Sequence, residues 1–334
     1  MMKATVDPSI ADFIQSLPKT ETHLHIEGAV PWELLQETFP GEFESIPEAW
    51  APDFQYKSFT QFEDEVLSYA YRYYTSPERY HESAKRVFQS HLDQNVRYVE
   101  TSFHLGILER IGGAGPDIVD AIKSAVPEGL EVRLFMGMLR NHYQGDLIPL
   151  MDEIHTWEGL DGIDMHGHET IPWAAWAGDL WQRVREAGKF TKSHAGEFEG
   201  AKDVNTALDL LGTRRIQHGL GAAYDKATFQ RLLDEEIALD MCPVSNVKLR
   251  SVENVKKHPI REFFDAGVTV TVSTDDPTVF GNDLVHEYDL LMSHLNFTKK
   301  EVIQVARNGF QVALVEDSTR HAWLSELDQI ELTL

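Results

Sequence analysis

The sequence predicts an α/β protein of the (β/α)8 barrel class, with extra helices after the eighth strand. Eight short runs with strand composition alternate with helix-like segments along most of the 334 residues. Strands separated by helices pair in parallel, and eight such units close into a barrel. No linker, low-complexity run or repeat divides the chain. Residues 1–334 are therefore predicted to form one domain.

The first predicted strand is Pro18–Gly28, where polar and apolar residues alternate before a turn marked by Gly28 and Pro31. Seven further runs have strand composition and lie at Val96–Phe103, Val132–Leu139, Leu160–Met165, Phe190–His194, Arg215–His218, Ile237–Cys242 and Val268–Ser273. Together they supply the eight strands of the predicted barrel.

Helix signals fill the spaces between these strands. Pro31–Thr38 reads as a short helix that begins with proline, and Gly41–Tyr56, which has no clear period, is expected to be an ordered loop. Two helices follow, one opening at Phe59 and one capped at Ser76. Later helices are predicted at Trp173–Ala187, Ala201–Leu211 and Lys226–Glu235, with two or three more between Leu284 and Leu327 that pack outside the barrel.

Composition excludes several classes of protein. The chain has 30 basic and 54 acidic residues, a net charge of −24, which argues against nucleic acid or an anionic membrane as a partner. The single cysteine, Cys242, excludes an intramolecular disulfide and any cysteine-rich zinc site. No apolar run approaches the roughly 18 residues of a membrane span, and the first residues do not resemble a signal peptide. A cytoplasmic protein is expected, and no oligomeric state is predicted.

Histidines and carboxylates gather at the ends of the predicted strands, which is where barrels of this class carry their active sites. Taken singly, each is more simply a satisfied buried polar residue, but so many coincidences favour a common site. They are His23 and His25, then His166, His168 and Glu169, then His194 and Glu197, then His218, and finally Asp275 and Asp276.

Binding of a metal ion is the simplest explanation for a cluster of these residue types. Residues two apart on a strand share a face, so His23 and His25 can reach the same ion. With His194 and Asp275 they supply nitrogen and oxygen donors suited to zinc, and one position is left for water. A zinc-bound water has its pKa lowered to about 7. Iron, manganese or cobalt suit the same donors.

Three further residues have chemistry that would complement such a metal. Glu197 lies three residues after His194, just past the strand, where it could act as a general acid or base. His218 could orient or deprotonate the water from the neighbouring strand. Asp276, next to a ligand, would point elsewhere and bind substrate.

The constellation closely resembles the adenosine deaminase family of the amidohydrolase superfamily. The matching motifs are Thr22–Gly28, His194–Glu197, His218–Gly219 and Ser273–Pro277, and the match runs in order from Pro18 to the last helices. The resemblance implies one zinc held by His23, His25, His194 and Asp275, and a helical lid over the pocket after the first strand. Two-metal relatives carry a bridging lysine on strand four, where this chain has Met165 and His166.

By that resemblance the reaction is hydrolytic deamination of a 6-aminopurine nucleoside, with adenosine to inosine and ammonia as first choice. Glu197 would protonate ring nitrogen N1 as hydroxide attacks C6, and His218 would stabilise the attacking water. Asp276 would hydrogen-bond N7, and the backbone N–H of Gly167 would meet N3. His25 and Glu27 are also expected to contact the small-molecule purine.

The sequence departs from the family where the sugar would bind. Glu27 stands where adenosine-specific members usually carry aspartate, and Gly167-His168-Glu169 replaces their Gly-Asp-Glu. Strand two, Glu100–His104, lacks their common arginine. Free adenine and aminodeoxyfutalosine are therefore rival substrates.

Two readings from other classes remain beside the deaminase. An ester, amide or phosphoester hydrolase on the same barrel is disfavoured because Glu197 suits ring protonation. A barrel that only binds a partner is disfavoured because the metal ligands and Glu197 are all present.

Two buried residues are assigned structural roles. Lys192 lies two residues before His194, so it should face inward and form an ion pair with Asp164 or Asp240. Cys242, which precedes Pro243, is predicted to pack rather than to act as a nucleophile.

Overall fold

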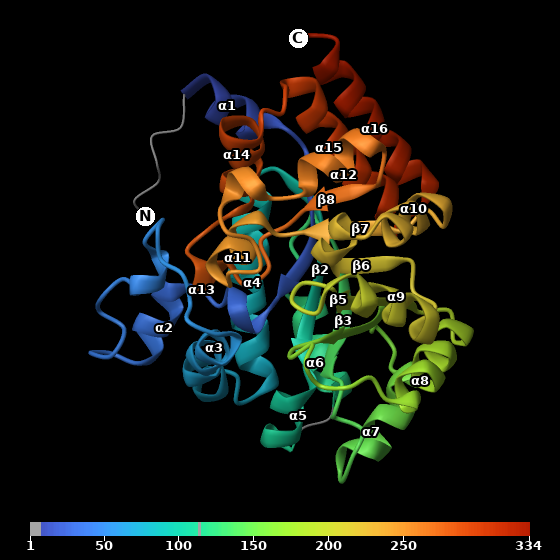
Figure 1. The fold of residues 1–334 in the computed structure, drawn as a ribbon. Helices are drawn as coiled ribbons and strands as arrows, with labels where there is room; N and C mark the ends of the chain where they lie inside the picture. The colour runs from blue at the N-terminus through green and yellow to red at the C-terminus, as the bar shows by residue number, and fades with distance from the viewer. Residues whose placement is uncertain (1–7, 113–114) are drawn as a thin grey trace.

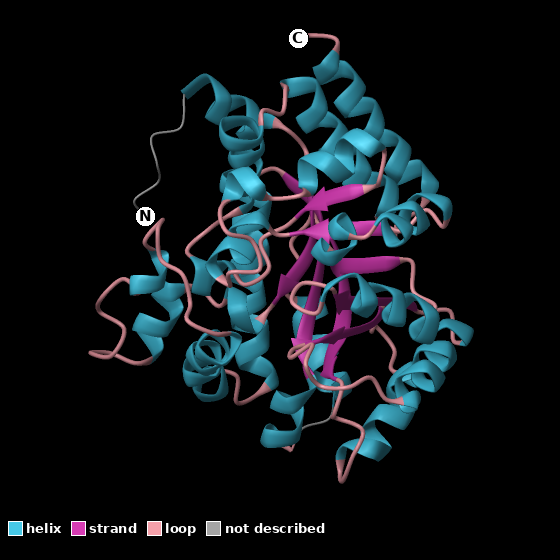
Figure 2. Cartoon of the chain, in the orientation of Figure 1, coloured by secondary structure: helices cyan, strands magenta, loops and turns pink. Residues whose placement is uncertain are grey.

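A computed structural model describes residues 8–112 and 115–334, and eight parallel strands follow one another around its barrel in sequence order (Figures 1 and 2). All seven consecutive strand pairs are parallel. The strands are β1 (Lys19–His25), β2 (Val96–His104), β3 (Glu131–Leu139), β4 (Gly162–His166), β5 (Phe190–Ala195), β6 (Arg215–His218), β7 (Ala238–Met241) and β8 (Val270–Val272). The predicted (β/α)8 fold is confirmed.

The end of β8 joins β1 and brings the two ends of the sheet together. The N–H of His25 donates to the carbonyl of Asp275 at 2.9 Å, and the N–H of Asp275 donates to the carbonyl of His23 at 3.0 Å. Deeper in the barrel, the N–H of Thr22 donates to Ser273 Oγ at 3.0 Å. Three residues predicted as metal ligands therefore lie at this seam.

Helices surround the sheet (Figure 2). In the first half they are α1 (Pro8–Ser16), α2 (Trp32–Thr38), α3 (Phe59–Tyr73), α4 (Pro77–Asp93), α5 (Leu105–Ile111), α6 (Gly115–Ser124) and α7 (Leu147–Glu153). In the second half they are α8 (Ala175–Glu186), α9 (Gly200–Leu211), α10 (Lys226–Asp234), α11 (Pro243–Lys248), α12 (Ile260–Ala266), α13 (Pro277–Phe280), α14 (Leu284–Leu295), α15 (Lys299–Val312) and α16 (Asp317–Glu331). Helix α15 packs against β1 and β8, and α14 packs against α1, so the expected C-terminal helices lie outside the barrel.

Local sequence explains where several elements begin. The Ser58 side chain accepts the N–H of Gln61 and caps α3, and Pro77 and Pro243 occupy the first turns of α4 and α11. Because α11 begins at Pro243, β7 ends before Cys242 and is shorter than predicted. The expected loop at 41–56 contains one helical turn, η2 (Glu48–Trp50). No helix of the described residues is long and apolar enough to cross a membrane.

The buried ion pair of Lys192 exists, but its predicted partner is wrong. Lys192 Nζ lies 3.2 Å from Glu100 Oε2, and both side chains are buried. Asp164 lies instead beside His194, and Asp240 pairs with Arg215 at 2.7 Å. In a closed barrel, inward side chains of strands that are not neighbours in the sheet meet near the axis, so β5 reaches β2. That residues 1–334 form one domain stays a prediction.

Candidate active site

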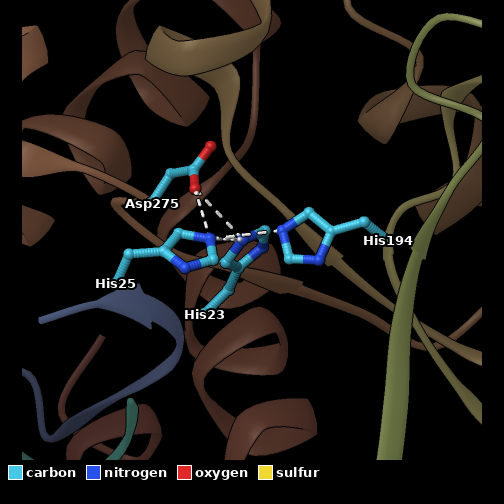
Figure 3. A group of neighbouring side chains, drawn as sticks. All are labelled: His23, His25, His194 and Asp275. Atoms are coloured by element: carbon cyan, nitrogen blue, oxygen red, sulfur yellow. Dashed lines mark hydrogen bonds and ion pairs between the residues drawn. The ribbon is translucent and has the colours of Figure 1, made fainter. Parts of the chain in front are cut away.

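Four side chains converge at the carboxyl ends of the strands (Figure 3). They are His23 and His25 of β1, His194 of β5 and Asp275 after β8, and their ligand atoms lie within 4.8 Å of one another. The Nε2 atom of His25 is 3.3 Å from Nε2 of His23 and 3.2 Å from Nε2 of His194. Oδ1 of Asp275 is 3.1 Å from Nε2 of His23 and 3.2 Å from Nε2 of His25.

These spacings fit four donors around one divalent ion. Nitrogen and oxygen ligands lie about 2.0–2.2 Å from zinc, and at tetrahedral angles such ligands are about 3.3 Å apart. The observed distances between these donor atoms, 3.1 to 3.3 Å, match the ligand–ligand distance of a tetrahedral site. Three imidazoles and one carboxylate, all largely buried, are also the donor types that zinc and similar first-row metals prefer.

Outer contacts orient two of the imidazoles for this task. Nδ1 of His194 donates to the carbonyl of Met165 at 3.0 Å, and because a carbonyl only accepts, Nε2 keeps its lone pair for the ion. Nδ1 of His25 lies 2.9 Å from Ser102 Oγ. Such contacts fix the ring orientation of a metal-binding histidine.

Further outer contacts involve Cys242 and Ser245. The Cys242 sulfur lies 3.4 Å from Nδ1 of His23, and burial raises the pKa of its thiol well above its usual range. A thiol held neutral in this way is a poor nucleophile. Ser245 Oγ donates to Oδ2 of Asp275 at 2.7 Å, which leaves Oδ1 facing the histidines.

Glu197 and His218 lie together beside the four-residue group. Nε2 of His218 is 3.5 Å from Oε2 of Glu197 and 3.8 Å from Oδ2 of Asp275. Burial and the nearby Asp275 raise the pKa of Glu197 well above its usual range, so its carboxyl group keeps its proton to a higher pH than an exposed glutamate does. Burial and the neighbouring His23 hold the pKa of His218 well below its usual range, so this imidazole is neutral.

At the carboxyl ends of the strands, two residues of the site have a strained backbone conformation and one glycine is closely packed. His218 and Asp275 have φ angles of 63° and 64°, in the left-handed region that residues other than glycine rarely adopt. A Cβ added at Gly28 would lie 1.7 Å from Oδ1 of Asp276. Only glycine therefore leaves room for the Asp276 carboxylate beside the first strand.

A cavity opens next to this group. Helix α3, the predicted lid, contributes six residues to its wall: Phe59, Phe62, Glu63, Val66, Leu67 and Ala70. The other predicted site residues on its wall are His25, Glu27, Gly167, His194, Glu197, His218, Asp275 and Asp276. Among the residues that the structure describes, no lysine or arginine lines this cavity.

The lid is tied to the loop after β4. Oε2 of Glu63, on α3, lies 3.0 Å from Nε2 of His168, and the ring of Phe59 packs on the His168 ring with centroids 4.6 Å apart. His168, one of the departures from the family pattern, therefore contacts the lid.

A second group of polar wall residues comes from the turn after β1 and from the ends of β2 and β4. Oε1 of Glu27 accepts the hydroxyl of Tyr80 at 2.7 Å and the N–H of His104 at 2.9 Å. Nδ1 of His104 lies 2.8 Å from Nε2 of His166. Burial lowers the pKa of His104 to about 3 and holds that of His166 well below its usual range, so the two imidazoles form a neutral pair.

Several residues of the site were not assigned roles from the sequence. His104, His166 and Glu169 line the cavity, and Asn246 and Ser251 donate to Oε1 of Glu197 at 2.8 and 3.2 Å. His166 and Glu169 were among the strand-end residues expected at a common site, without a role, and His104 ends the second strand, where the same reasoning would have found it. Asn246 and Ser251 lie within and after α11, and no pattern in the sequence indicates them.

Comparison with known proteins gives the same picture. The family model described as adenosine deaminase matches residues 18–330. An adenine deaminase of Acinetobacter baylyi is 28% identical over 96% of this chain and 99% of its own length. An adenosine deaminase of Shewanella denitrificans is 33% identical over 64% of this chain and 65% of its own. The crystal structure of an adenine deaminase from Arthrobacter aurescens has a TM-score of 0.85 and 27% identity, covering 94% of this chain and 99% of that one.

The barrel fold, the group of four metal-type donors and the family match over nearly the whole chain all indicate the same family. The chain belongs to the adenosine deaminase family and is a hydrolytic deaminase that acts on purine C–N bonds.

Proposed function

We propose that residues 1–334 act as one domain that hydrolyses the 6-amino group of free adenine, with adenosine as the second candidate. The observation that carries the chemistry is the meeting, in one cavity, of the four metal-type ligands and the buried Glu197. The relatives that match nearly the whole chain, such as the one from Acinetobacter baylyi, support adenine.

The wall at Glu27 also supports a free base. The Tyr80 hydroxyl and the His104 N–H both donate to Oε1 of Glu27, whose side chain lines the cavity. This side chain could accept a further hydrogen from a substrate, and free adenine, unlike a nucleoside, offers an N–H at N9. Adenosine, the first choice from the sequence, would instead place ribose hydroxyls against Glu27 and the imidazole pair.

The chain's own residues divide the work of deamination. The Glu197 carboxyl group donates its proton to N1, which makes C6 electrophilic, and the Gly167 N–H and Asp276 fix the ring at N3 and N7. The neutral His218 imidazole orients the attacking water and can accept its proton. Water adds at C6, the proton accepted by His218 passes to the amino nitrogen, and the C–N bond breaks as ammonia leaves. The remaining hydroxyl proton returns to Glu197, which gives a 6-oxopurine that keeps the proton on N1.

His23, His25, His194 and Asp275 would hold one Zn²⁺. When bound, such an ion acts as a Lewis acid and lowers the pKa of a water molecule to about 7. Zinc is our choice because three imidazoles and one carboxylate match its common ligands.

The charges on the cavity wall favour a substrate that carries no negative charge. The wall has carboxylates at Glu27, Glu63 and Glu169 in addition to those at the reaction centre, and no lysine or arginine among the described residues. A phosphate or a second carboxylate on the substrate would face these groups without a cation. AMP and aminodeoxyfutalosine, which carries a benzoate group, are therefore poor candidates.

A substrate panel tests this proposal. Zinc-loaded protein is incubated with adenine, adenosine, deoxyadenosine, methylthioadenosine, AMP and aminodeoxyfutalosine, and absorbance and ammonia are followed, with Glu197→Gln as the blank. Turnover of adenine above the others, lost in the variant, is the expected result. Preference for adenosine would replace the first candidate by the second, and preference for AMP would contradict the charge argument.

A further inference from the structure

The loop that carries Glu197 is held through its backbone by two buried carboxylates. It follows β5 and leads into α9, so its N–H groups include the unpaired donors of a helix N-terminus. Four consecutive N–H groups donate to these carboxylates: Gly196 to Oδ2 of Asp203 at 3.2 Å, Glu197 to Oε1 of Glu169 at 2.9 Å, and Phe198 and Glu199 to Oε2 of Glu169 at 2.8 Å each.

Glu169 belongs to the loop after β4, two residues beyond Gly167. Arg140, just past β3, holds this loop and the α9 helix together, since its guanidinium donates to the carbonyl of Glu169 at 2.6 Å and to Oδ2 of Asp203 at 2.7 Å. The same guanidinium lies 3.7 Å from the ring centroid of Trp173. The loops after β3, β4 and β5 therefore form one connected, buried assembly around the Glu169 carboxylate.

We infer that Glu169 is a positioning residue that fixes the Glu197 carboxyl group relative to the Gly167 N–H. Both groups line the same cavity, and Glu169 is the side chain that links their loops. Without its carboxylate, three backbone N–H groups lose their acceptor, and the loop would relax to find others. This inference rests on the proposed function for the roles of Glu197 and Gly167, but the loop geometry itself does not.

The charge of Glu169 adds a second effect. After burial and Asp275, the Glu169 carboxylate contributes to raising the pKa of Glu197. The His218 imidazole also faces Glu197, with Nε2 3.5 Å from Oε2. Burial and Asp203 raise the pKa of Glu169 itself, and its three backbone N–H donors oppose that rise. The Arg140 guanidinium contacts the backbone carbonyl of Glu169. Removing the charge should therefore lower the pKa at which Glu197 loses its proton.

Glu169→Gln tests both effects, because it keeps the size and removes the charge. Hydrogen exchange at the amides of residues 196–199 should become at least about tenfold faster. If the Glu197 carboxyl group is displaced by about 1 Å, kcat should fall up to about 100-fold. KM should change less than about threefold, and the zinc content should equal that of the wild type. The high-pH limb of the kcat/KM profile should move to lower pH by about one unit.

Matched variants make the result decisive. Glu301→Gln removes a carboxylate of the capping box of α15 that does not line the cavity, and should leave exchange at 196–199 and turnover unchanged. Glu169→Asp keeps the charge on a shorter side chain, so exchange should rise and kcat fall while the high-pH limb stays in place.

The outcomes separate the inference from the proposed function. Wild-type exchange and wild-type kcat in Glu169→Gln would overturn the inference. If wild-type protein deaminates no purine, the proposed function fails, and hydrogen exchange alone still decides whether Glu169 holds the loop. If Glu169→Gln does not fold, the exchange of Glu169→Asp decides, and wild-type protection there would overturn the inference.

Discussion

Replacing Gly28 with alanine should damage the active site without removing any functional group. Gly28 lies in the short helical turn η1 (Glu27–Ala29), and an added Cβ would be 1.7 Å from Oδ1 and 2.5 Å from Cγ of Asp276. Because a real Cβ essentially never approaches a neighbour closer than 3.0 Å, Oδ1 must move away by more than 1 Å. Misplacing a substrate-binding group by about 1 Å can cost about 100-fold in rate.

We therefore expect kcat/KM of Gly28→Ala to fall about 100-fold while bound metal stays at one equivalent, with about 1–3 kcal/mol of stability lost to overpacking. Initial rates of deamination and metal analysis measure the two effects. Gly188→Ala is the control, because Gly188 has φ +78° and open space around it. It should lose about 1–2 kcal/mol of stability and keep its kcat/KM. A Gly28→Ala enzyme within about threefold of wild-type kcat/KM would refute a role for Asp276 in binding.

Three further predictions follow from the contacts of the site. Ser102→Ala removes the partner of His25 Nδ1 and should weaken metal affinity by about 10–100-fold in a competitive chelator titration, and equal affinity would show that this contact does not orient the ring. Lys192→Met leaves the buried Glu100 with Arg215 as a remaining cation, 3.3 Å away, and should lower the free energy of unfolding by about 1–3 kcal/mol in denaturant titrations, whereas no loss would show that the Lys192 contact does not stabilise the fold. Glu197 must be protonated to act as an acid, and burial raises its pKa, so kcat/KM should fall as pH rises through that raised pKa. A flat profile on the basic side would contradict this role.

The barrel was predictable because its signal is repeated. Each strand is a short apolar run followed by a helix signal, and the right-handed βαβ rule leaves few alternatives for eight such units. Strand ends were harder to predict. Cys242 fits a strand pattern, but it also directly precedes α11, which begins at Pro243, and the sequence alone does not show that a helix begins there.

The metal-type group was also predictable, because its members lie at strand ends and the fold brings those ends together. Contacts across the barrel were not. Lys192 meets Glu100 rather than a residue of an adjacent strand, since the distance across the axis depends on strand tilt and on the sizes of the inward side chains. The role of Glu169 was hidden for a related reason, since it depends on the path of two loops that carry no periodic signal.

The most direct test of the account is hydrolysis of adenine in H₂¹⁸O by zinc-loaded wild-type protein, followed by mass spectrometry of the purine and assay of ammonia. We expect a 6-oxopurine that carries one ¹⁸O, an equal amount of ammonia, loss of both after metal removal, and recovery on adding Zn²⁺. Failure of the metal-loaded protein to release ammonia from adenine or adenosine, or a product without the label, would contradict it.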